Sequence, residues 1–221
     1  MSPTLIGMRR SRALAPFDVV FGHALAGEPC QLKAADSAPV PLPVTRWRDP
    51  ADDVDLAMID ECVGATIDVG CGPGRLTVAL AERGHVALGI DITSASVEAT
   101  TERGGSVLQR DVFGPLPGEG RWETALLADG NIGIGGNPVA LLGRIRALLT
   151  RAGRVVVEVD PPGSPSRVVR AHLQCDCART RPFDWFVLGL DDVAPVAQAA
   201  GFRLLGSHRR DERCWSVLEV A

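Results

Sequence analysis

The stretch from Ala65 to Thr93 constrains this chain most strongly, because it has the order strand, glycine-rich turn, helix, strand and acid. Residues 65–69 form a short apolar run, and residues 70–74 include three glycines. Residues 76–83 then carry apolar side chains at helical spacing, up to a glycine that ends the helix. A second apolar strand at 86–90 leads to Asp91. The stretch therefore predicts a β–α–β unit with two parallel strands.

Each residue type in this unit suits a nucleotide-like ligand. Glycines let backbone N–H groups approach a ligand closely. The N-terminus of the helix that follows favours a negative group. A carboxylate at the end of the second strand, here Asp91, can accept hydrogen bonds from both hydroxyls of a ribose. The ligand should therefore contain a ribose and an anionic group.

The spacing of the glycines argues against a dinucleotide. The fingerprint G-x-G-x-x-G is met by Gly70 and Gly72, but Arg75 stands at its third glycine. Asp68, two residues before the first glycine, would repel a pyrophosphate and could pair with an amino-acid ammonium. A ligand with a ribose, an adenine and an amino-acid tail fits better than NAD.

The residues Asp68, Gly70, Cys71, Gly72 and Gly74 match the pattern D-x-G-C-G-x-G. This pattern resembles motif I of class I S-adenosylmethionine (SAM)-dependent methyltransferases, and the resemblance covers residues 57–221. It implies an α/β fold: a three-layer sandwich with a Rossmann-like, seven-stranded, mostly parallel sheet. The last strand would be antiparallel and inserted beside the fifth. The implied cofactor is SAM, with S-adenosylhomocysteine as its product.

The resemblance also implies roles for individual residues. Asp68 would hold the ammonium, Asp91 the ribose and Asp111 the adenine amine, with Val112 packed on the adenine ring. The Asp-Gly-Asn sequence after the fourth strand would border the methyl group or the methionine tail, and an arginine before motif I is a speculative partner for the carboxylate. The expected cofactor-binding set is Arg46, Asp68, Gly70, Cys71, Gly72, Gly74, Asp91, Ile92, Asp111, Val112, Asp129, Gly130 and Asn131.

Catalysis needs little from the protein beyond alignment and desolvation, because the leaving group is a neutral thioether. A general base is needed only if the acceptor must lose a proton. His23, Asp129 and His172 are the candidate bases. A lone histidine is more often structural than catalytic.

Composition narrows the class of partner and compartment. The net charge of −4 gives no electrostatic footprint for nucleic acid or an anionic membrane, and no apolar run approaches the roughly 20 residues of a membrane helix. The six cysteines form no C-x-x-C pair, and no secretory signal is evident, so we expect reduced thiols in the cytoplasm. His172, Cys175 and Cys177 invite a zinc interpretation, but C-x-C spacing is poor for a tetrahedral site and a fourth ligand is not obvious, so no metal is expected.

The rest of the chain predicts a cover over the site. Residues 1–56 are expected to form N-terminal helices and a lid-like segment, and residues 57–221 the SAM-binding methyltransferase domain, in a single domain overall. Residues 164–182 are the least regular part and predict an exposed insertion after the fifth strand. Phe183, Trp185 and Phe186 could line an acceptor pocket or belong to the core.

The function predicted is SAM-dependent methyl transfer to a small-molecule acceptor. Two alternatives stay open. One is a SAM-binding enzyme of this fold with different chemistry, such as cyclisation, and the other is a non-catalytic SAM-binding partner protein. An NAD-dependent oxidoreductase is disfavoured by Arg75 and Asp68. The acceptor atom and the oligomeric state are not readable from the sequence.

Overall fold

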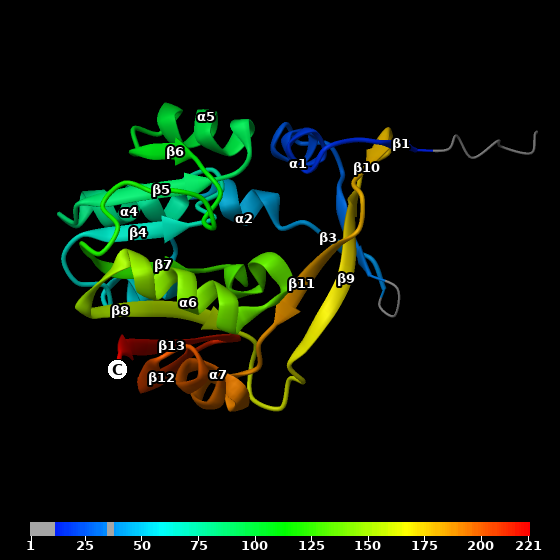
Figure 1. The fold of residues 1–221 in the computed structure, drawn as a ribbon. Coiled ribbons are helices and arrows are strands. Elements are labelled where there is room, and N and C mark those ends of the chain that lie inside the picture. Colours follow the sequence, from blue (N-terminus) through cyan, green and yellow to red (C-terminus); the bar gives the residue numbers. More distant parts are fainter. Residues whose placement is uncertain (1–11, 35–37) are drawn as a thin grey trace, which may run out of the picture.

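The computed structural model describes residues 12–34 and 38–221. Most of this part forms a seven-stranded sheet with the order β12-β13-β8-β7-β4-β5-β6 (Figure 1). Strands β4 to β8 pair in parallel, and β13 lies antiparallel between β8 and β12. The bounds are β4 Thr66–Val69, β5 Ala87–Asp91, β6 Val107–Gln109, β7 Trp122–Leu127, β8 Leu149–Val159, β12 Phe202–Arg210 and β13 Arg213–Val220. The predicted parallel sheet with an antiparallel last strand beside the fifth is confirmed.

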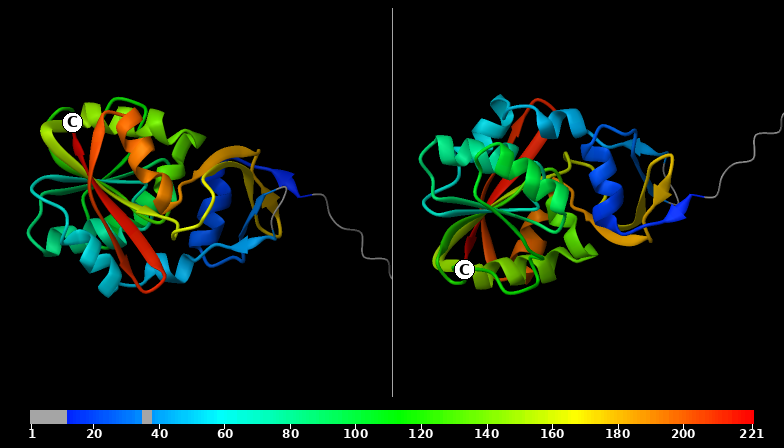
Figure 2. Two further views of the ribbon diagram at one scale, coloured as in Figure 1. Left: turned by 90° about the horizontal axis from the view of Figure 1, so that it is seen from below. Right: turned by 90° about the horizontal axis from the view of Figure 1, so that it is seen from above.

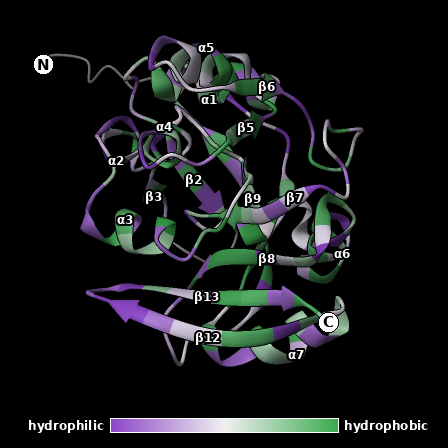
Figure 3. Ribbon diagram, turned by 90° about the vertical axis from the view of Figure 1, so that its left-hand side faces the viewer, coloured by the Kyte–Doolittle hydropathy of each residue, from purple (hydrophilic) through white to green (hydrophobic). Residues whose placement is uncertain are grey.

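Helices cover both faces of this sheet, which gives the predicted three layers. They are α3 Asp53–Ile59, α4 Arg75–Glu82 and α5 Ser94–Glu102 on one face, and α6 Pro138–Leu148 and α7 Val193–Ala199 on the other. Leu126 of β7 is buried against the α3 and α4 side, whereas Ala125 and Leu127 are buried against α6 and α7. Successive strand residues face opposite layers, so a strand covered on both faces is a continuous apolar run. Figure 3 shows this hydrophobic colouring along the middle of the sheet.

The helix ends follow from local sequence. Asp52 caps α3: its side chain accepts from the backbone N–H groups of Val54 and Asp55, and the Asp55 side chain accepts from the N–H of Asp52. Pro138 stands in the first turn of α6, where it loses no helical hydrogen bond. The Asn137 side chain caps that helix. Both starts agree with the sequence signals.

A second sheet stands beside the first, at the carboxyl ends of its parallel strands (Figures 1 and 2). Its order is β1-β10-β9-β2-β3, with β11 also paired to β9. The bounds are β1 Ala13–Leu14, β2 Gln31–Ala34, β3 Val40–Pro41, β9 Arg167–Gln174, β10 Ala178–Arg179 and β11 Phe183–Val187. Helix α1, Phe17–Leu25, packs on it through Val20 and Ala24. The short elements α2 Val44–Arg48, η1 Asn131–Gly136 and η2 Leu190–Asp192 complete the described chain.

This second sheet corrects the expectation of an irregular insertion at 164–182. That segment instead holds β9 and β10, because β9 is paired on both sides by β2 and β11. The sheet draws strands from both sides of the predicted division at residue 56, which stays a prediction about domains. Residues 1–11 of the predicted N-terminal part, and residues 35–37 between β2 and β3, lie outside the described residues.

Strand β12 runs through Arg210, and only residues 211–212 turn before β13, with Asp211 at a φ of 53°. Among the described helices, none combines the length and apolarity needed to cross a bilayer.

Candidate active site

The glycine-rich turn between β4 and α4 is held by a side chain from another strand end. Gly70, Gly72 and Gly74 have φ angles of 72°, 53° and 82°, a region that glycine adopts without strain. The side-chain amide of Asn131 donates to the carbonyl oxygens of Val69 and Gly70, both at 2.9 Å. A Cβ atom on Gly70 would lie 2.8 Å from the Asn131 amide nitrogen. The close approach of Asn131 therefore requires glycine at position 70.

Asp91, at the end of β5, lies against the same turn. One of its oxygens accepts from the Gly72 N–H at 3.0 Å, and the other accepts from the Thr93 N–H and hydroxyl, each at 2.8 Å. Burial raises the pKa of Asp91, and these donors act in the opposite direction. Cys71 lies behind the turn, where a Cβ on Gly89 would come within 2.8 Å of its sulfur. The carboxylate is thus fixed beside the glycines.

Asp68 is the most buried acid among the residues that line the cavity, with 2 % of its surface exposed. Its carboxylate accepts a hydrogen bond from the Thr77 hydroxyl at 2.7 Å. Burial raises the pKa of Asp68 to about 7, since the lowering effect of Thr77 is smaller and the carboxylates of Asp129 and Asp91 raise the pKa further. A cation placed beside Asp68 would favour its ionised form.

The predicted adenine-binding residues lie at the other end of the turn. Asp111 follows β6 and accepts from the backbone N–H of Phe113 at 3.0 Å. Val112 is buried, whereas Ile92 is 52 % exposed at the cavity wall. These positions bring an acid and two apolar side chains to one rim, which is the chemistry that a purine ring requires.

A network of arginines and acids forms the floor beyond Asp68. Arg75 is 4 % exposed, and its guanidinium binds Asp55 and donates to Asp129 at 2.7 Å. Arg46 lies 2.9 Å from the second oxygen of Asp129, and Arg213 binds Asp55 at 2.7 Å. The sequence analysis used Arg75 only as a departure from the dinucleotide fingerprint and did not foresee this network. The residues of this network lie on α2, α3, α4 and two strand ends, so no local sequence pattern signals the network.

The structure separates the three candidate bases. Asp129 lines the cavity in a left-handed conformation, φ 53°, with its backbone N–H bound to Glu158 at 2.7 Å. His23 and His172 are not among the cavity-lining residues. For His172 the reason is its place in β9. Successive side chains of a strand face opposite sides, and the neighbouring Leu173 is the residue that lines the cavity. The structure therefore does not bring the two histidines to the site.

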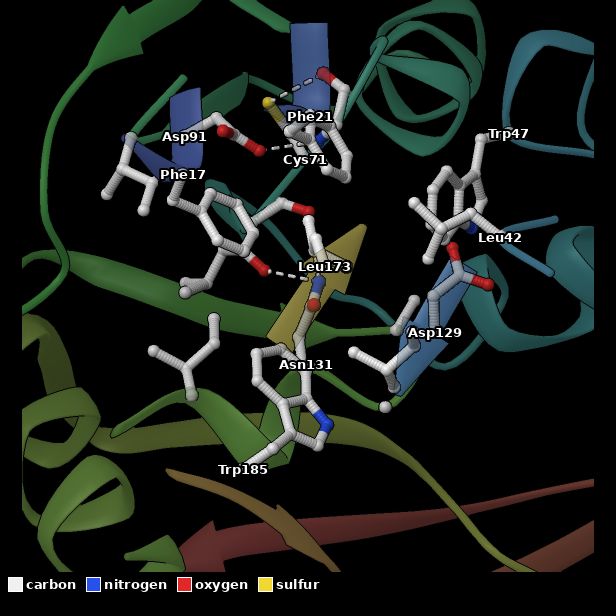
Figure 4. Close-up of a pocket in the computed structure, with 18 of the residues that line it drawn as sticks. Phe17, Phe21, Leu42, Trp47, Cys71, Asp91, Asp129, Asn131, Leu173 and Trp185 are labelled. Atoms are coloured by element: carbon white, nitrogen blue, oxygen red, sulfur yellow. Dashed lines mark hydrogen bonds between the residues drawn. The ribbon is translucent and has the colours of Figure 1, made fainter. Parts of the chain in front are cut away.

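The opposite wall of the cavity is apolar and aromatic (Figure 4). The rings of Phe17 and Phe21 stack with their centroids 5.6 Å apart, and Phe183 meets Phe17 edge-on at 5.4 Å. Trp185 also lines the cavity, whereas Phe186 packs against the main core. The sequence left open whether Phe183, Trp185 and Phe186 line a pocket or belong to the core. In the structure Phe183 and Trp185 line the cavity, and Phe186 packs against the core. The wall consists of Phe17, Phe21, Leu32, Leu42, Trp47, Leu173, Phe183 and Trp185.

These two walls enclose one cavity of about 1390 Å³. Ligand pockets usually measure about 300–1,000 Å³, so this cavity has room for two molecules side by side. Among the predicted cofactor residues, Gly74 does not line it; a Cβ there would meet Thr100 at 2.6 Å, so its glycine serves packing. The lining includes Arg46, Asp68, Gly70, Cys71, Gly72, Asp91, Ile92, Asp111, Val112, Asp129, Gly130 and Asn131.

The cavity thus lies at the carboxyl ends of the parallel strands of an α/β fold. Residues 67–119 match the family model described as a methyltransferase domain. This match covers the glycine turn, Asp91 and Asp111.

Solved structures share the fold at low sequence identity. A SAM-dependent methyltransferase from Bacteroides fragilis, in complex with S-adenosylhomocysteine, is 19 % identical, with a TM-score of 0.76 over 95 % of this chain and 98 % of that one. The 1,6-didemethyltoxoflavin-N1-methyltransferase of Burkholderia thailandensis is 20 % identical, with a TM-score of 0.60 over 80 % and 81 %. A glycopeptide N-methyltransferase is 14 % identical, with a TM-score of 0.57 over 76 % and 94 %. These neighbours differ in their named acceptors, so the fold does not define the acceptor.

Proposed function

We propose that this enzyme transfers a methyl group from SAM to a small, largely apolar acceptor that contains an aromatic ring. One observation carries the proposal: a single cavity has Asp68 and the turn residues Gly70, Cys71 and Gly72 on one wall and eight apolar or aromatic side chains on the other. Aromatic faces favour stacked or edge-on contact with another ring. The acceptor would lie between the glycine turn and the second sheet.

In this proposal the polar wall holds the cofactor. Asp91 accepts from the ribose hydroxyls, and Asp111 accepts from the adenine amine. Asp68 supplies negative charge near the ammonium, and Arg46 supplies positive charge near the carboxylate. Arg46 already contacts Asp129 at 2.9 Å, so cofactor binding would redistribute this ion pair. The apolar side chains of Ile92 and Val112 would cover the adenine faces.

The chain acts mainly by alignment. SAM, when bound, supplies an electrophilic methyl group whose departure from sulfur leaves a neutral thioether. The aromatic wall excludes water and orients the acceptor lone pair in line with the carbon–sulfur bond. Asp129 is the one candidate base on the cavity wall, but Arg46 and Arg75 both contact its carboxylate and compete for its lone pairs. We therefore infer that the chain supplies no strong base and that the acceptor is nucleophilic by itself.

The named acceptors of the neighbours support a small molecule without defining it. The Burkholderia enzyme holds 1,6-didemethyltoxoflavin, a small compound, whereas another neighbour is described as acting on a glycopeptide. Aromatic rings from α1 and β11 line the apolar side of the cavity, and we infer that they contact a compact acceptor. A cytoplasmic location is part of this proposal, supported by six free cysteines.

The first test is calorimetric titration of the purified chain with SAM, S-adenosylhomocysteine and NAD. Micromolar binding of the two sulfur compounds without binding of NAD is expected. A screen of aromatic small molecules with methyl-labelled SAM then identifies the acceptor by label in the product. Tight SAM binding with products that never carry the label would instead support non-methylating chemistry. If neither SAM nor S-adenosylhomocysteine binds, the cofactor assignment is wrong.

A further inference from the structure

A pair of thiols and a histidine meet outside the cavity, where α1 approaches the hairpin of β9 and β10. Cys175 and Cys177 lie in the turn of this hairpin, and His23 lies in the last turn of α1. Figure 1 shows α1 and the hairpin at the same end of the second sheet. None of the three residues lines the cavity, so the proposed methyl transfer does not involve them.

The two sulfur atoms are close enough to bond after a small movement. Sγ of Cys175 is 3.3 Å from Sγ of Cys177. A disulfide bond measures about 2.05 Å, so the gap would close by about 1.3 Å. The turn holds the two residues together, because the Cys175 N–H donates to the Ala178 carbonyl oxygen at 2.9 Å. The pair is therefore arranged for oxidation to a disulfide.

The two thiols differ in their access to solvent. All six cysteines lie within the described residues, and five of them are buried whereas Cys177 is exposed. Cys175 is 2 % exposed, and its sulfur contacts the Ala178 carbonyl oxygen at 3.4 Å. A small oxidant dissolved in water therefore reaches Cys177 first. An accessible thiol beside a second thiol that resolves its oxidised form is typical of redox-sensitive sites, including those of reducing compartments.

His23 provides a base for the exposed thiol. Its Nε2 is 4.0 Å from Sγ of Cys177, and its Nδ1 is 2.8 Å from a carboxylate oxygen of Glu28. When Nδ1–H donates to Glu28, Nε2 is the unprotonated nitrogen and can accept the thiol proton. A nucleophile, a base and a group that orients the base form the arrangement that activates cysteine. The thiol needs this base, because its hydrogen bond with Cys175 raises the pKa of Cys177.

Other charged and titratable groups face the same two sulfurs. The second oxygen of Glu28 is 3.9 Å from the exposed sulfur, and its negative charge disfavours the thiolate. Arg12 donates to the carbonyl oxygen of Cys175 at 2.7 Å and lies 3.7 Å from Asp176 in the same turn. Cys30 is a third thiol, whose pKa is raised to about 12 by burial and by Cys175. A proton that moves from the exposed sulfur to the imidazole forms an ion pair with Glu28, which favours that transfer.

We propose that Cys177 is a site of oxidation by hydroperoxides and that Cys175 converts the oxidised residue into a disulfide. In the first step the Cys177 sulfur attacks one peroxide oxygen, the O–O bond breaks, and the thiol proton passes through His23 to the leaving oxygen. This step forms a sulfenic acid and releases an alcohol, or water from hydrogen peroxide.

In the second step the Cys175 sulfur attacks the sulfur of the sulfenic acid. The S–O bond breaks, and the Cys175 proton leaves with the hydroxide as water. Two thiols are thus oxidised to one disulfide for each hydroperoxide reduced. This inference depends on neither the cofactor nor the acceptor.

The test treats the reduced, purified full chain with hydrogen peroxide and then with an alkylating reagent. Cleavage at arginine gives one peptide, residues 171–179, that contains both cysteines. This peptide should lose the mass of two hydrogen atoms and both alkylation sites, and a thiol reductant should restore them. A peptide that stays fully alkylated after peroxide treatment would overturn the proposal. So would oxidation of one of the other four cysteines ahead of this peptide.

Two variants separate the roles of the cysteines. Cys177→Ser, at an exposed position, should leave this peptide unreactive, whereas Cys175→Ala should stop at a sulfenic acid that dimedone captures. Dimedone should also capture sulfenic acid at Cys177 in the wild type at early times, which tests the order of the steps without a buried substitution. Sulfenic acid at Cys175 in the Cys177→Ser peptide would contradict that order.

His23→Ala tests the base. Near neutral pH the oxidation of the peptide should slow by on the order of 100-fold, because general-base assistance is lost. The rate in the variant should keep rising at pH values where the wild-type rate has levelled off, since only ionisation of the thiol itself then supplies the thiolate. His85→Ala is the matched control, because His85 lies between α4 and β5 and contacts the Gly64 carbonyl oxygen. Equal rates in His23→Ala and the wild type would exclude His23 as the base.

Discussion

The two walls of the cavity differ in how the chain builds them. The polar wall comes largely from one contiguous stretch, in which Asp68, the glycine turn and Asp91 follow one another along a single β–α–β unit. The aromatic wall joins α1, the segment before α3, and strands β9 and β11, which lie more than 100 residues apart. The first wall is fixed by local backbone geometry, and the second by long-range strand pairing. Changes on one wall should therefore affect cofactor binding, and changes on the other should affect the acceptor.

The largest expected effect is loss of SAM binding in Gly72→Val. A Cβ there meets no protein atom within 4 Å, so the new side chain would occupy the cavity instead. Overpacking of about 3 kcal/mol corresponds to roughly 100-fold weaker binding by calorimetry. Gly84→Val is the matched control, because Gly84 has a φ of 87° and open space but lies outside the cavity lining. Equal SAM affinity in both variants would move the cofactor away from Gly72.

Asp91→Ala should give the next largest effect. Its carboxylate would lose the ribose hydroxyls, and the N–H groups of Gly72 and Thr93 would lose their acceptor. Hydrogen bonds to a charged group are worth about 1.5–3 kcal/mol, or roughly 10–150-fold in the dissociation constant for SAM. The KM for the acceptor, measured at saturating SAM, should stay within about twofold. A titration curve like that of the wild type would exclude Asp91 from the site.

Phe17→Ala tests the aromatic wall. Removing this half-buried ring deletes contacts with Phe21 and Phe183, and the loss of about 1.5 kcal/mol of apolar contact predicts a roughly tenfold higher acceptor KM. SAM affinity should be unchanged. Val19→Ala, on the exposed side of the same helix, is the control. If Phe17→Ala weakened SAM binding and left the acceptor KM unchanged, the assignment of the two walls would be reversed.

Asp68→Asn should produce the smallest and most pH-dependent effect. The pKa of Asp68 is about 7 in the folded protein against an ordinary 3.8. The folded state therefore holds its proton more tightly, and the cofactor-free protein loses stability from this group as pH rises between about 4 and 7. Asparagine does not ionise and so removes that loss. The free energy of unfolding of the variant should exceed that of the wild type by on the order of 2 kcal/mol at pH 8, and by a smaller amount at pH 5.

SAM binding should show the opposite trend at this residue. The wild type should bind SAM more weakly at pH 6 than at pH 8, because protonation of Asp68 removes the charge that faces the ammonium. The variant should bind a few-fold more weakly at pH 8 and lose that pH dependence. Thermal melting of the cofactor-free proteins and calorimetry at both pH values check these outcomes. Parallel pH profiles in the two proteins would separate Asp68 from the ligand.

The central sheet was predictable because its information is short-range. A buried strand is predicted by the three consecutive residues Val155, Val156 and Val157, and a helix end by Gly84. Each signal lies within a few residues. The interpretation of 164–182 as irregular was wrong because β9 owes its order to pairing with β2, more than 130 residues earlier. Such pairing leaves no periodic signal in the segment itself.

The candidate site divides in the same way. The positions of Asp68, Asp91 and Asp111 at successive strand ends followed from the order of elements, since parallel strands end at one edge of the sheet. The histidines could not be placed, because the side of β9 on which His172 lies depends on its register with β2 and β11. His23 lies 4.0 Å from the sulfur of Cys177 only in the fold, because the two residues are 154 positions apart in the sequence.

The sequence by itself determined the polar wall, because glycine φ angles, a helix start and an acid at a strand end are local properties of consecutive residues. Tertiary structure alone decided three things: the aromatic wall, the burial of Arg75 between Asp55 and Asp129, and the meeting of α1 with the β9–β10 hairpin. These depend on contacts between residues far apart in the chain. Their formation follows from how two sheets bury their apolar faces, which no single stretch of sequence specifies.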